Sequence, residues 1–209
     1  CIRDSLYIDD AHGMSWTGTH GRGHLLARLA LTRRVVVATS LAKAYGVGGG
    51  VLLFADREEA DLARLVGGPY CFSGPLRPGD VGAIVASARL HLTPELSRLQ
   101  SALDTRVRQA NLLCRELRLP VMVENEVPFF FLPMGSAEAV YSMADRLFED
   151  GLHVSVSGFP AVPSARGGLR IALSAIHRIE DCLRVFERAA HHYPAVLAAA
   201  GLSQAELRA

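Results

Sequence analysis

The sequence has little net charge and no long apolar run. Its 22 Lys and Arg residues nearly balance its 21 Asp and Glu residues, so the formal charge at pH 7 is +1. Because acids and bases are interspersed, we expect no surface field that would collect nucleic acid or anionic membrane. No apolar stretch reaches the ~20 residues that a membrane span requires, since Lys43 interrupts the longest candidate. The sequence therefore predicts a protein with no nucleic-acid partner and no membrane span.

Metal-binding and disulfide signatures are absent as well. The four cysteines form no Cys-x-x-Cys pair, and no histidine stands at metal-ligand spacing from them. We interpret Cys71, Cys114 and Cys182 as buried thiols in a reducing cytoplasm, and Cys1 as lying near a cut end. The N-terminus also lacks a basic segment followed by an apolar one, so nothing in it indicates export.

The sequence does contain ample material for a core, because half of its 209 residues are hydrophobic. The chain opens at Cys1 without methionine, and a strand pattern begins almost at once, at Leu6. We therefore expect this chain to be the back portion of a longer protein.

Three short runs of β-forming residues, 6–9, 35–39 and 51–55, are apolar throughout instead of alternating. Such runs are typical of strands that helices cover on both faces, and they predict an α/β sheet. Helices are expected at residues 58–66, 80–91 and 94–119. In the last of these, one apolar face is expected to hold Leu96, Leu99, Leu103, Val107, Leu112 and Leu113.

After the long helix the pattern changes to strand, helix, strand, strand and helix, which fits a compact α+β domain. We therefore divide the chain into domains of residues 1–105 and 106–209. The later elements are expected at residues 129–132, 137–150 with Gly151 as its stop, 154–157, 169–173 and 179–190.

Lys43 follows an apolar strand by about one turn and precedes the glycine run Gly48–Gly50. Beside a cationic cofactor and partly out of water, a lysine pKa falls, so that the amine can hold an aldehyde as a Schiff base. The glycine run lacks the residues of a phosphate loop or a dinucleotide turn, so we interpret it as close backbone packing. A lysine after a strand is more often a solvated surface group, and both interpretations stay open on this feature alone.

Asp9 ends the first strand, which we expect to be buried, so its carboxylate needs a cationic partner. A protonated pyridine nitrogen is such a partner, and the carboxylate then keeps the ring electron-withdrawing. His12 is placed to contact the same ring or a reacting carbonyl. The alternatives are an Asx-turn at Asp9 or Asp10 and a hydrogen-bonded loop histidine.

Three further residues are candidates for binding anionic groups. Ser40 stands three residues before Lys43, close enough for its hydroxyl to meet a phosphate, and Ser73 is a weaker second candidate, because Ser-Gly-Pro is also an ordinary loop. Arg170 begins a strand, where an inward-facing guanidinium would match the two oxygens of a carboxylate. At a strand edge, an arginine in a surface salt bridge is the commoner case.

Taken together, these motifs resemble the α-oxoamine synthases of the fold-type I pyridoxal phosphate enzymes. This family includes 8-amino-7-oxononanoate synthase, glycine C-acetyltransferase, 5-aminolevulinate synthase and serine palmitoyltransferase. The resemblance spans Tyr7 to about Phe186 and rests on the order of the segments Asp9–Gly13, Gly18–Gly23, Ser40–Lys43, Phe72–Ser73 and Leu169–His177.

The resemblance implies that residues 1–105 are the C-terminal part of a large cofactor-binding domain and 106–209 a small C-terminal domain. It implies that pyridoxal 5′-phosphate is bound by Lys43 as a Schiff base, by Asp9 at the pyridine nitrogen and by His12 at the ring oxygen. Ser40 is implied to bind phosphate, with Ser73 doing so from the neighbouring subunit of a homodimer. Arg170 is implied to hold the substrate carboxylate.

The implied reaction condenses an amino acid with an acyl-CoA, usually with loss of carbon dioxide, and His12 is expected to assist acyl transfer. The sequence departs from the family at Gly74, where a second hydroxyl often follows, and at Gly158–Pro163, which is closer to the serine palmitoyltransferase form. The family's earlier half has no counterpart here. An aminotransferase using the same residues, a non-catalytic dimerisation subunit, and delivery of the acyl group by a carrier protein stay open as alternatives.

Overall fold

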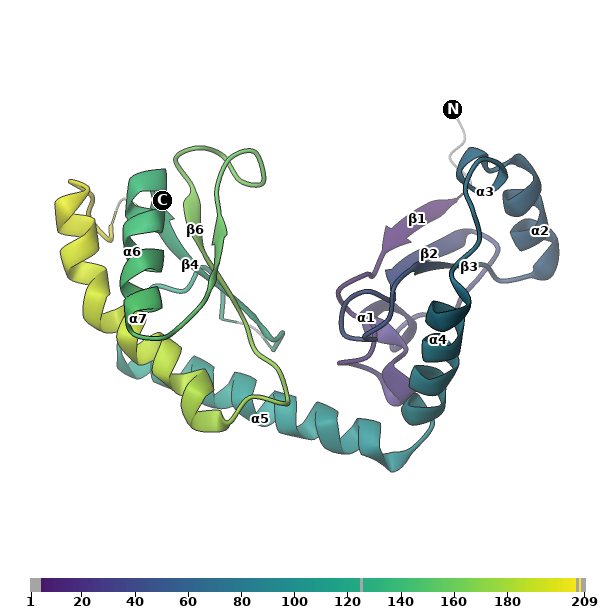
Figure 1. Ribbon diagram of the computed structural model, residues 1–209, viewed down its shortest axis with the longest axis horizontal. Helices are drawn as coiled ribbons and strands as arrows, with labels where there is room; N and C mark the ends of the chain where they lie inside the picture. Colours follow the sequence, from purple (N-terminus) through teal and green to yellow (C-terminus); the bar gives the residue numbers. More distant parts are fainter. Residues whose placement is uncertain (1–4, 125, 206, 208–209) are drawn as a thin grey trace. The chain divides into compact units, whose positions relative to one another are not determined.

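The computed structural model describes residues 5–124, 126–205 and 207. These residues form two compact units divided between Gln100 and Ser101, called unit 1 and unit 2 below (Figure 1). The expected domain division after residue 105 falls in the same helix, α5 (Pro94–Glu116), as the division between the units. The assignment of the two expected domains stays a prediction.

Unit 1 contains a three-stranded mixed sheet in the order β1-β2-β3. The strands are β1 (Leu6–Asp9), β2 (Val35–Ser40) and β3 (Gly50–Leu53), close to the three predicted runs. β1 pairs with β2 in parallel, and β3 pairs with β2 in antiparallel fashion. The helical segments of this unit are η1 (Thr19–Gly21), α1 (Gly23–Leu26), α2 (Arg57–Val66), α3 (Gly68–Cys71) and α4 (Pro78–His91).

The strands of unit 1 are less covered than their apolar composition predicted. Leu6 and Tyr7 in β1 keep 63% and 68% of their surface exposed, whereas Val37 and Thr39 in β2 are buried. The expectation that all three strands are covered on both faces is therefore wrong. The small apolar cluster of the unit gathers around Leu41 with Ile84 and Ala88 of α4, and it does not include Leu6 or Tyr7.

Unit 2 is an α+β arrangement with an antiparallel sheet in the order β4-β6-β5. Its sheet and the helices α6 and α7 enclose a core that includes the edge-to-face ring pair Phe130 and Phe186, whose centroids lie 4.9 Å apart. The elements are β4 (Phe129–Gly135), α6 (Ala137–Glu149), β5 (Ser155–Ser157), β6 (Gly167–Ala172) and α7 (Ile179–Ala199).

Side-chain hydrogen bonds cap the N-termini of two of the helices. The Asp56 carboxylate accepts the Glu59 backbone N–H at 3.0 Å ahead of α2, and the Ser136 hydroxyl accepts that of Ala139 at 3.2 Å ahead of α6. Gly151, with φ of 80°, follows the end of α6 in the left-handed region. The predicted glycine stop is confirmed.

Two helices differ from the expected pattern. Leu112 of α5 is 51% exposed, and Ala110 and Cys114 take its place on the buried face, since they follow Val107 at helical spacings of three and seven. α7 continues past its expected end at residue 190 to Ala199, although Pro194 lies inside it. Burial of Tyr193, Val196 and Leu197 outweighs the proline.

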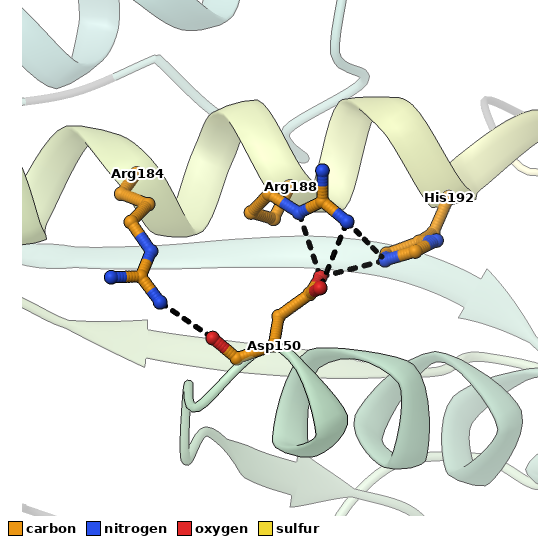
Figure 2. Close-up of polar contacts among 4 residues, drawn as sticks. All are labelled: Asp150, Arg184, Arg188 and His192. Atoms are coloured by element: carbon orange, nitrogen blue, oxygen red, sulfur yellow. Dashed lines mark hydrogen bonds and ion pairs between the residues drawn. The ribbon is translucent and has the colours of Figure 1, made fainter.

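Asp150, which follows α6, ties that helix to α7 (Figure 2). Its carboxylate accepts two hydrogen bonds from Arg188, each 2.8 Å, and lies 2.7 Å from His192 Nε2, while its carbonyl accepts from Arg184. The Arg188 bonds, followed by the His192 contact, lower the pKa of the Asp150 carboxyl to about 2.

The cysteines fall into two groups. Cys114 and Cys182 are buried, as expected, and burial raises the pKa of the Cys114 thiol to about 12. Cys71 is exposed, so the expectation of a third buried thiol is wrong. It ends the short helix α3, which buries no side chain. Cys1 lies outside the described residues.

Across residues 5–124, 126–205 and 207, no helix combines the length and the apolar character needed to cross a bilayer. Within the same described residues, no group of three potential metal-ligating side chains gathers.

Candidate active site

The parallel pairing of β1 and β2 decides where the chemistry-bearing residues lie. Asp9 pairs with Ala38, and the Asp10 backbone N–H donates to the Ala38 carbonyl at 2.8 Å. The carboxyl ends of both strands therefore meet at one edge of the sheet. Because Asp9 ends β1, His12 follows it and Lys43 follows β2, the structure brings these three residues to the same edge.

The strand pairing also decides on which face of the sheet each side chain lies. Side chains alternate along a strand, so Val37 and Thr39 point to one face of β2, where both are buried. Ala38 and Ser40 point to the opposite face. Since paired residues in neighbouring strands share a face, Asp9 lies on the same face as Ala38 and Ser40.

Lys43 lies in an exposed turn whose ends are anchored. Buried Leu41 and Val47 flank it, joined by a hydrogen bond from the Val47 N–H to the Leu41 carbonyl at 2.8 Å. The Lys43 carbonyl itself accepts from the Gly46 N–H at 2.9 Å. The segment therefore holds the lysine backbone in place while its amine is accessible to a ligand.

Lys43 is also the only lysine of the chain, which uses arginine at the other 21 of its 22 basic Lys and Arg positions. The motif-based argument did not use this signal, although composition alone provides it. A chain that places its one primary side-chain amine at this sheet edge offers a single position for imine chemistry.

Asp9 differs from its expected environment. Its side chain is exposed, so the argument that burial forces a cationic partner on it is wrong. Its Oδ1 accepts the Ala11 backbone N–H at 2.8 Å, which is the Asx-turn considered as an alternative. A carboxylate has a second oxygen, so this turn orients the group and still permits it to accept from another donor.

His12 is exposed at the start of the loop that follows β1, and its carbonyl accepts a hydrogen bond from the indole of Trp16. The loop winds tightly around Asp10, whose Oδ2 accepts the Leu25 N–H at 2.9 Å. A Cβ added at Gly13 or Gly23 would lie 2.1 Å or 2.5 Å from the Asp10 carboxylate oxygens, so only glycine fits at either position. The sequence argument gave Asp10 no binding role, and its function here is to shape the loop.

The two candidate phosphate-binding serines have local partners. Ser40 Oγ accepts the Ala42 backbone N–H at 3.2 Å and so supports the turn before Lys43. Ser73 is exposed beyond α3, and its hydroxyl donates to the Pro69 carbonyl. The structure places Ser40 at the same edge as Lys43. Ser73 lies elsewhere in unit 1, in the segment between α3 and α4.

Arg170 belongs to unit 2, in β6. It is exposed, and its guanidinium lies 5.1 Å from the centroid of the Phe129 ring on the neighbouring strand β4. It lines a hollow of about 280 Å³ together with residues that include His153, His177 and Asp181. Among the residues that the structure describes, its side-chain contact is this aromatic one and not the surface salt bridge that is commoner for such an arginine.

Comparisons with known proteins identify the family of this chain. The family described as aminotransferase class I and II matches residues 5–188. The 8-amino-7-oxononanoate synthase of Thermosipho melanesiensis is 30% identical over 88% of this chain and 46% of its own length. That of Mycobacterium sp. strain JLS is 35% identical over 81% of this chain and 43% of its own length. The chain thus spans about half the length of the curated relatives it matches.

The fold also has a close counterpart among solved structures. Serine palmitoyltransferase from S. paucimobilis superposes with a TM-score of 0.82 at 23% identity, over 92% of this chain and 48% of that one. The expected α/β fold of a fold-type I transferase is confirmed, as is the resemblance to the α-oxoamine synthases. With its family match covering most of its length, the chain belongs to the aminotransferase class I and II family.

Proposed function

We propose that the chain carries the cofactor-anchoring part of a pyridoxal phosphate-dependent C-acyltransferase. The observation that carries the proposal is the parallel β1–β2 pair, which brings Asp9, His12 and the only lysine to one sheet edge. When bound, pyridoxal phosphate supplies a cationic ring that withdraws electrons from the α-carbon of an amino acid. The residues at this edge fit it, because an exposed amine, carboxylate and imidazole all belong to the carboxyl ends of the two paired strands or to the segments that follow them.

Each residue has a distinct task in this proposal. Lys43 Nζ would hold the cofactor aldehyde, and as a free amine it would be the base that takes a proton from the substrate α-carbon. Asp9, oriented by its Asx-turn, accepts from the pyridine nitrogen and keeps it protonated. His12 contacts the ring oxygen and assists acyl transfer, and the Ser40 hydroxyl binds phosphate.

Binding of the substrate carboxylate is proposed for Arg170. Its guanidinium is held against the Phe129 ring, which restricts the planar fork without occupying its N–H donors. The amino acid and an acyl-CoA, or an acyl carrier, are the proposed substrates, and the product is an α-oxoamine. Support comes from the relatives, which are named 8-amino-7-oxononanoate synthase.

We further propose a cytoplasmic homodimer in which Ser73 serves the neighbouring subunit. Phe72, next to it, is 93% exposed, and Leu65, Val66 and Tyr70 are also exposed around α2 and α3. Contiguous exposed apolar side chains favour a protein partner over solvent.

An aminotransferase is the second candidate, because the family match itself is to aminotransferases of class I and II. It would use the same amine and carboxylate but release a keto acid. Release of a ketone with free CoA from an amino acid and an acyl-CoA would favour the acyltransferase, and release of a keto acid would favour the alternative.

The cofactor assignment is tested by incubating the chain with pyridoxal phosphate, reducing it with borohydride and mapping the adduct by mass spectrometry. Since Lys43 is the only lysine, we expect a side-chain adduct at this residue alone. Lys43→Arg is the matched control, because it keeps the positive charge but cannot form the bond. An adduct confined to the α-amino group in the wild-type chain would contradict the assignment.

A further inference from the structure

A buried histidine with no proposed role in cofactor binding contacts both the loop that carries His12 and the turn that carries Lys43. His91, the last residue of α4, is only 7% exposed. Its Nδ1 lies 2.7 Å from the Ser87 carbonyl and its Nε2 lies 2.9 Å from Ser15 Oγ. Because a carbonyl can only accept, Nδ1 carries a proton, and in the neutral ring Nε2 accepts from the Ser15 hydroxyl.

The partner of His91 lies in the loop that carries His12. Ser15 is buried and has a φ of 77°, a left-handed conformation that a residue with a Cβ adopts at a cost. Its carbonyl accepts a further hydrogen bond from the Gln100 side chain at 2.8 Å. Contacts from α4 and α5 therefore hold Ser15 in a backbone conformation that is unfavourable without them.

A second strained residue of the same loop is also held by His91. His20 has a φ of 56°, and its Nδ1 donates to the His91 carbonyl at 3.1 Å. Gly21 leaves room for the imidazole, since a Cβ there would lie 2.7 Å from His91 Cδ2. Ser15 and Gly21 are thus shaped around the His91 side chain, while His20 is bonded to the His91 backbone.

The other face of the ring supports the lysine segment. The His91 imidazole stacks on the Tyr45 ring with centroids 4.6 Å apart and an interplanar angle of 29°. Tyr45 stands two residues after Lys43, and its carbonyl accepts from the Ser87 hydroxyl at 2.8 Å. The same histidine therefore touches the segment of the amine and the loop of His12.

We propose that His91 is a positioning residue that fixes the His12 loop and the Lys43 segment relative to each other. It acts through the Ser15 hydroxyl on one side and the Tyr45 ring on the other. The inference rests on the proposed function for the roles of His12 and Lys43. The contacts of His91 with Ser15 and Tyr45 do not depend on that function.

Trp16 is the natural reporter, because it is the only tryptophan, follows Ser15 directly and donates to the His12 carbonyl. We expect His91→Phe, which retains an aromatic ring against Tyr45 but offers no acceptor, to raise acrylamide quenching of Trp16 about two- to threefold under native conditions, through local opening. His91→Gln, whose amide oxygen can accept from Ser15, should restore most of the wild-type value. His191→Phe, an exposed position in unit 2, is the matched control and should change nothing.

Variants of Ser15 test the same hydrogen bond from its other partner. Ser15→Ala loses the hydroxyl and keeps the unfavourable φ, whereas Ser15→Gly loses the hydroxyl and removes the backbone cost, so quenching should rise more in the alanine variant. Combining His91→Phe with Ser15→Ala should add little beyond either change alone, because both remove the same bond.

Wild-type quenching in His91→Phe, or fully additive effects in the double variant, would overturn the inference, even if the midpoint of unfolding fell. Borohydride trapping at Lys43 is measured in parallel. A wild-type chain that fails to trap pyridoxal phosphate contradicts the proposed function, while the Trp16 result still decides the role of His91.

Discussion

The two units of this chain are stabilised in different ways. Unit 2 buries a continuous apolar core that runs from Val107 through the sheet to Leu197. Unit 1 has a small cluster around Leu41, Tyr45 and Val47, and it leaves Leu65 and Phe72 76% and 93% exposed. Polar contacts from Asp10, His91 and Gln100 shape its loops instead.

This difference follows the distribution of the proposed chemistry. Five of the six proposed binding residues lie in unit 1, where functional groups must stay accessible and loops must hold strained conformations. The sixth, Arg170, lies in unit 2 on a strand whose Leu169 and Ile171 belong to the apolar core. The comparison teaches that hydrogen bonds set the geometry of unit 1, whereas apolar packing sets that of unit 2.

The largest effect is expected when a buried phenylalanine of unit 2 is replaced, in comparison with an exposed phenylalanine of unit 1. Phe186→Ala removes a fully buried ring packed on Phe130 and should lower the free energy of unfolding by about 3–5 kcal/mol. Phe72→Ala, at an exposed ring of unit 1, should change it by less than about 0.5 kcal/mol. Urea unfolding followed by circular dichroism measures both, and equal losses would break the comparison.

A smaller effect is expected from overpacking the sheet of unit 2. A Cβ at Gly168 would lie 2.5 Å from the Leu132 carbonyl oxygen and 2.6 Å from the Phe131 ring. Gly168→Ala should therefore cost about 1–3 kcal/mol of unfolding free energy, because the neighbouring strand must shift. Gly158→Ala, where the added Cβ meets nothing within 4 Å, is the control. Thermal melts that fail to separate the two variants would disprove the close strand approach.

Loss of a helix cap should have a modest effect even within the well-packed unit. Ser136→Ala removes the acceptor for the Ala139 N–H at the start of α6 and should lower the unfolding free energy by about 0.5–2 kcal/mol. Ser101→Ala, at an exposed position inside α5, removes no cap and should be neutral or slightly stabilising. A urea titration of both variants distinguishes capping from the general effect of alanine.

The smallest effect is expected for Asp150, and it should be seen only at acidic pH. Because the pKa of Asp150 is lowered to about 2 in the folded state, its ionic contacts contribute stability fully above its unfolded pKa of about 3.9. That contribution is lost as the pH falls from there towards 2. Asp150→Asn should remove it, so the melting temperature of the variant should fall less steeply between pH 4 and 2 than that of the wild type. Asp145→Asn, at an exposed position of α6, should retain the wild-type slope.

Local signals predicted the elements well because their causes are local. Apolar runs predicted the strands, Gly151 marked the end of α6, and the motifs indicated the family. The errors arose where burial decided the outcome. Leu112 and Cys71 looked like core residues by composition but are exposed, and α7 continues through Pro194 because its later residues are buried.

For the candidate site, the sequence supplied Lys43, Asp9, His12, Ser40, Ser73 and Arg170, and their roles stay predictions. It did not supply His91, because a lone histidine at a helix end has no motif, and its partners Ser15 and Tyr45 are distant in sequence. Nor did it reveal that Asp9 is exposed, although it offered the Asx-turn as an alternative, since the exposure of a strand depends on what packs against it.

The sequence by itself determined the chemistry available to this protein: one primary side-chain amine, an acid after the first strand, and the order of strands and helices that places them. Tertiary structure decided which residues hold those groups in place. Pairing of β1 with β2 and the packing of α4 beneath both loops are long-range events, governed by the burial and hydrogen bonding of residues far apart along the chain, and no local pattern encodes them.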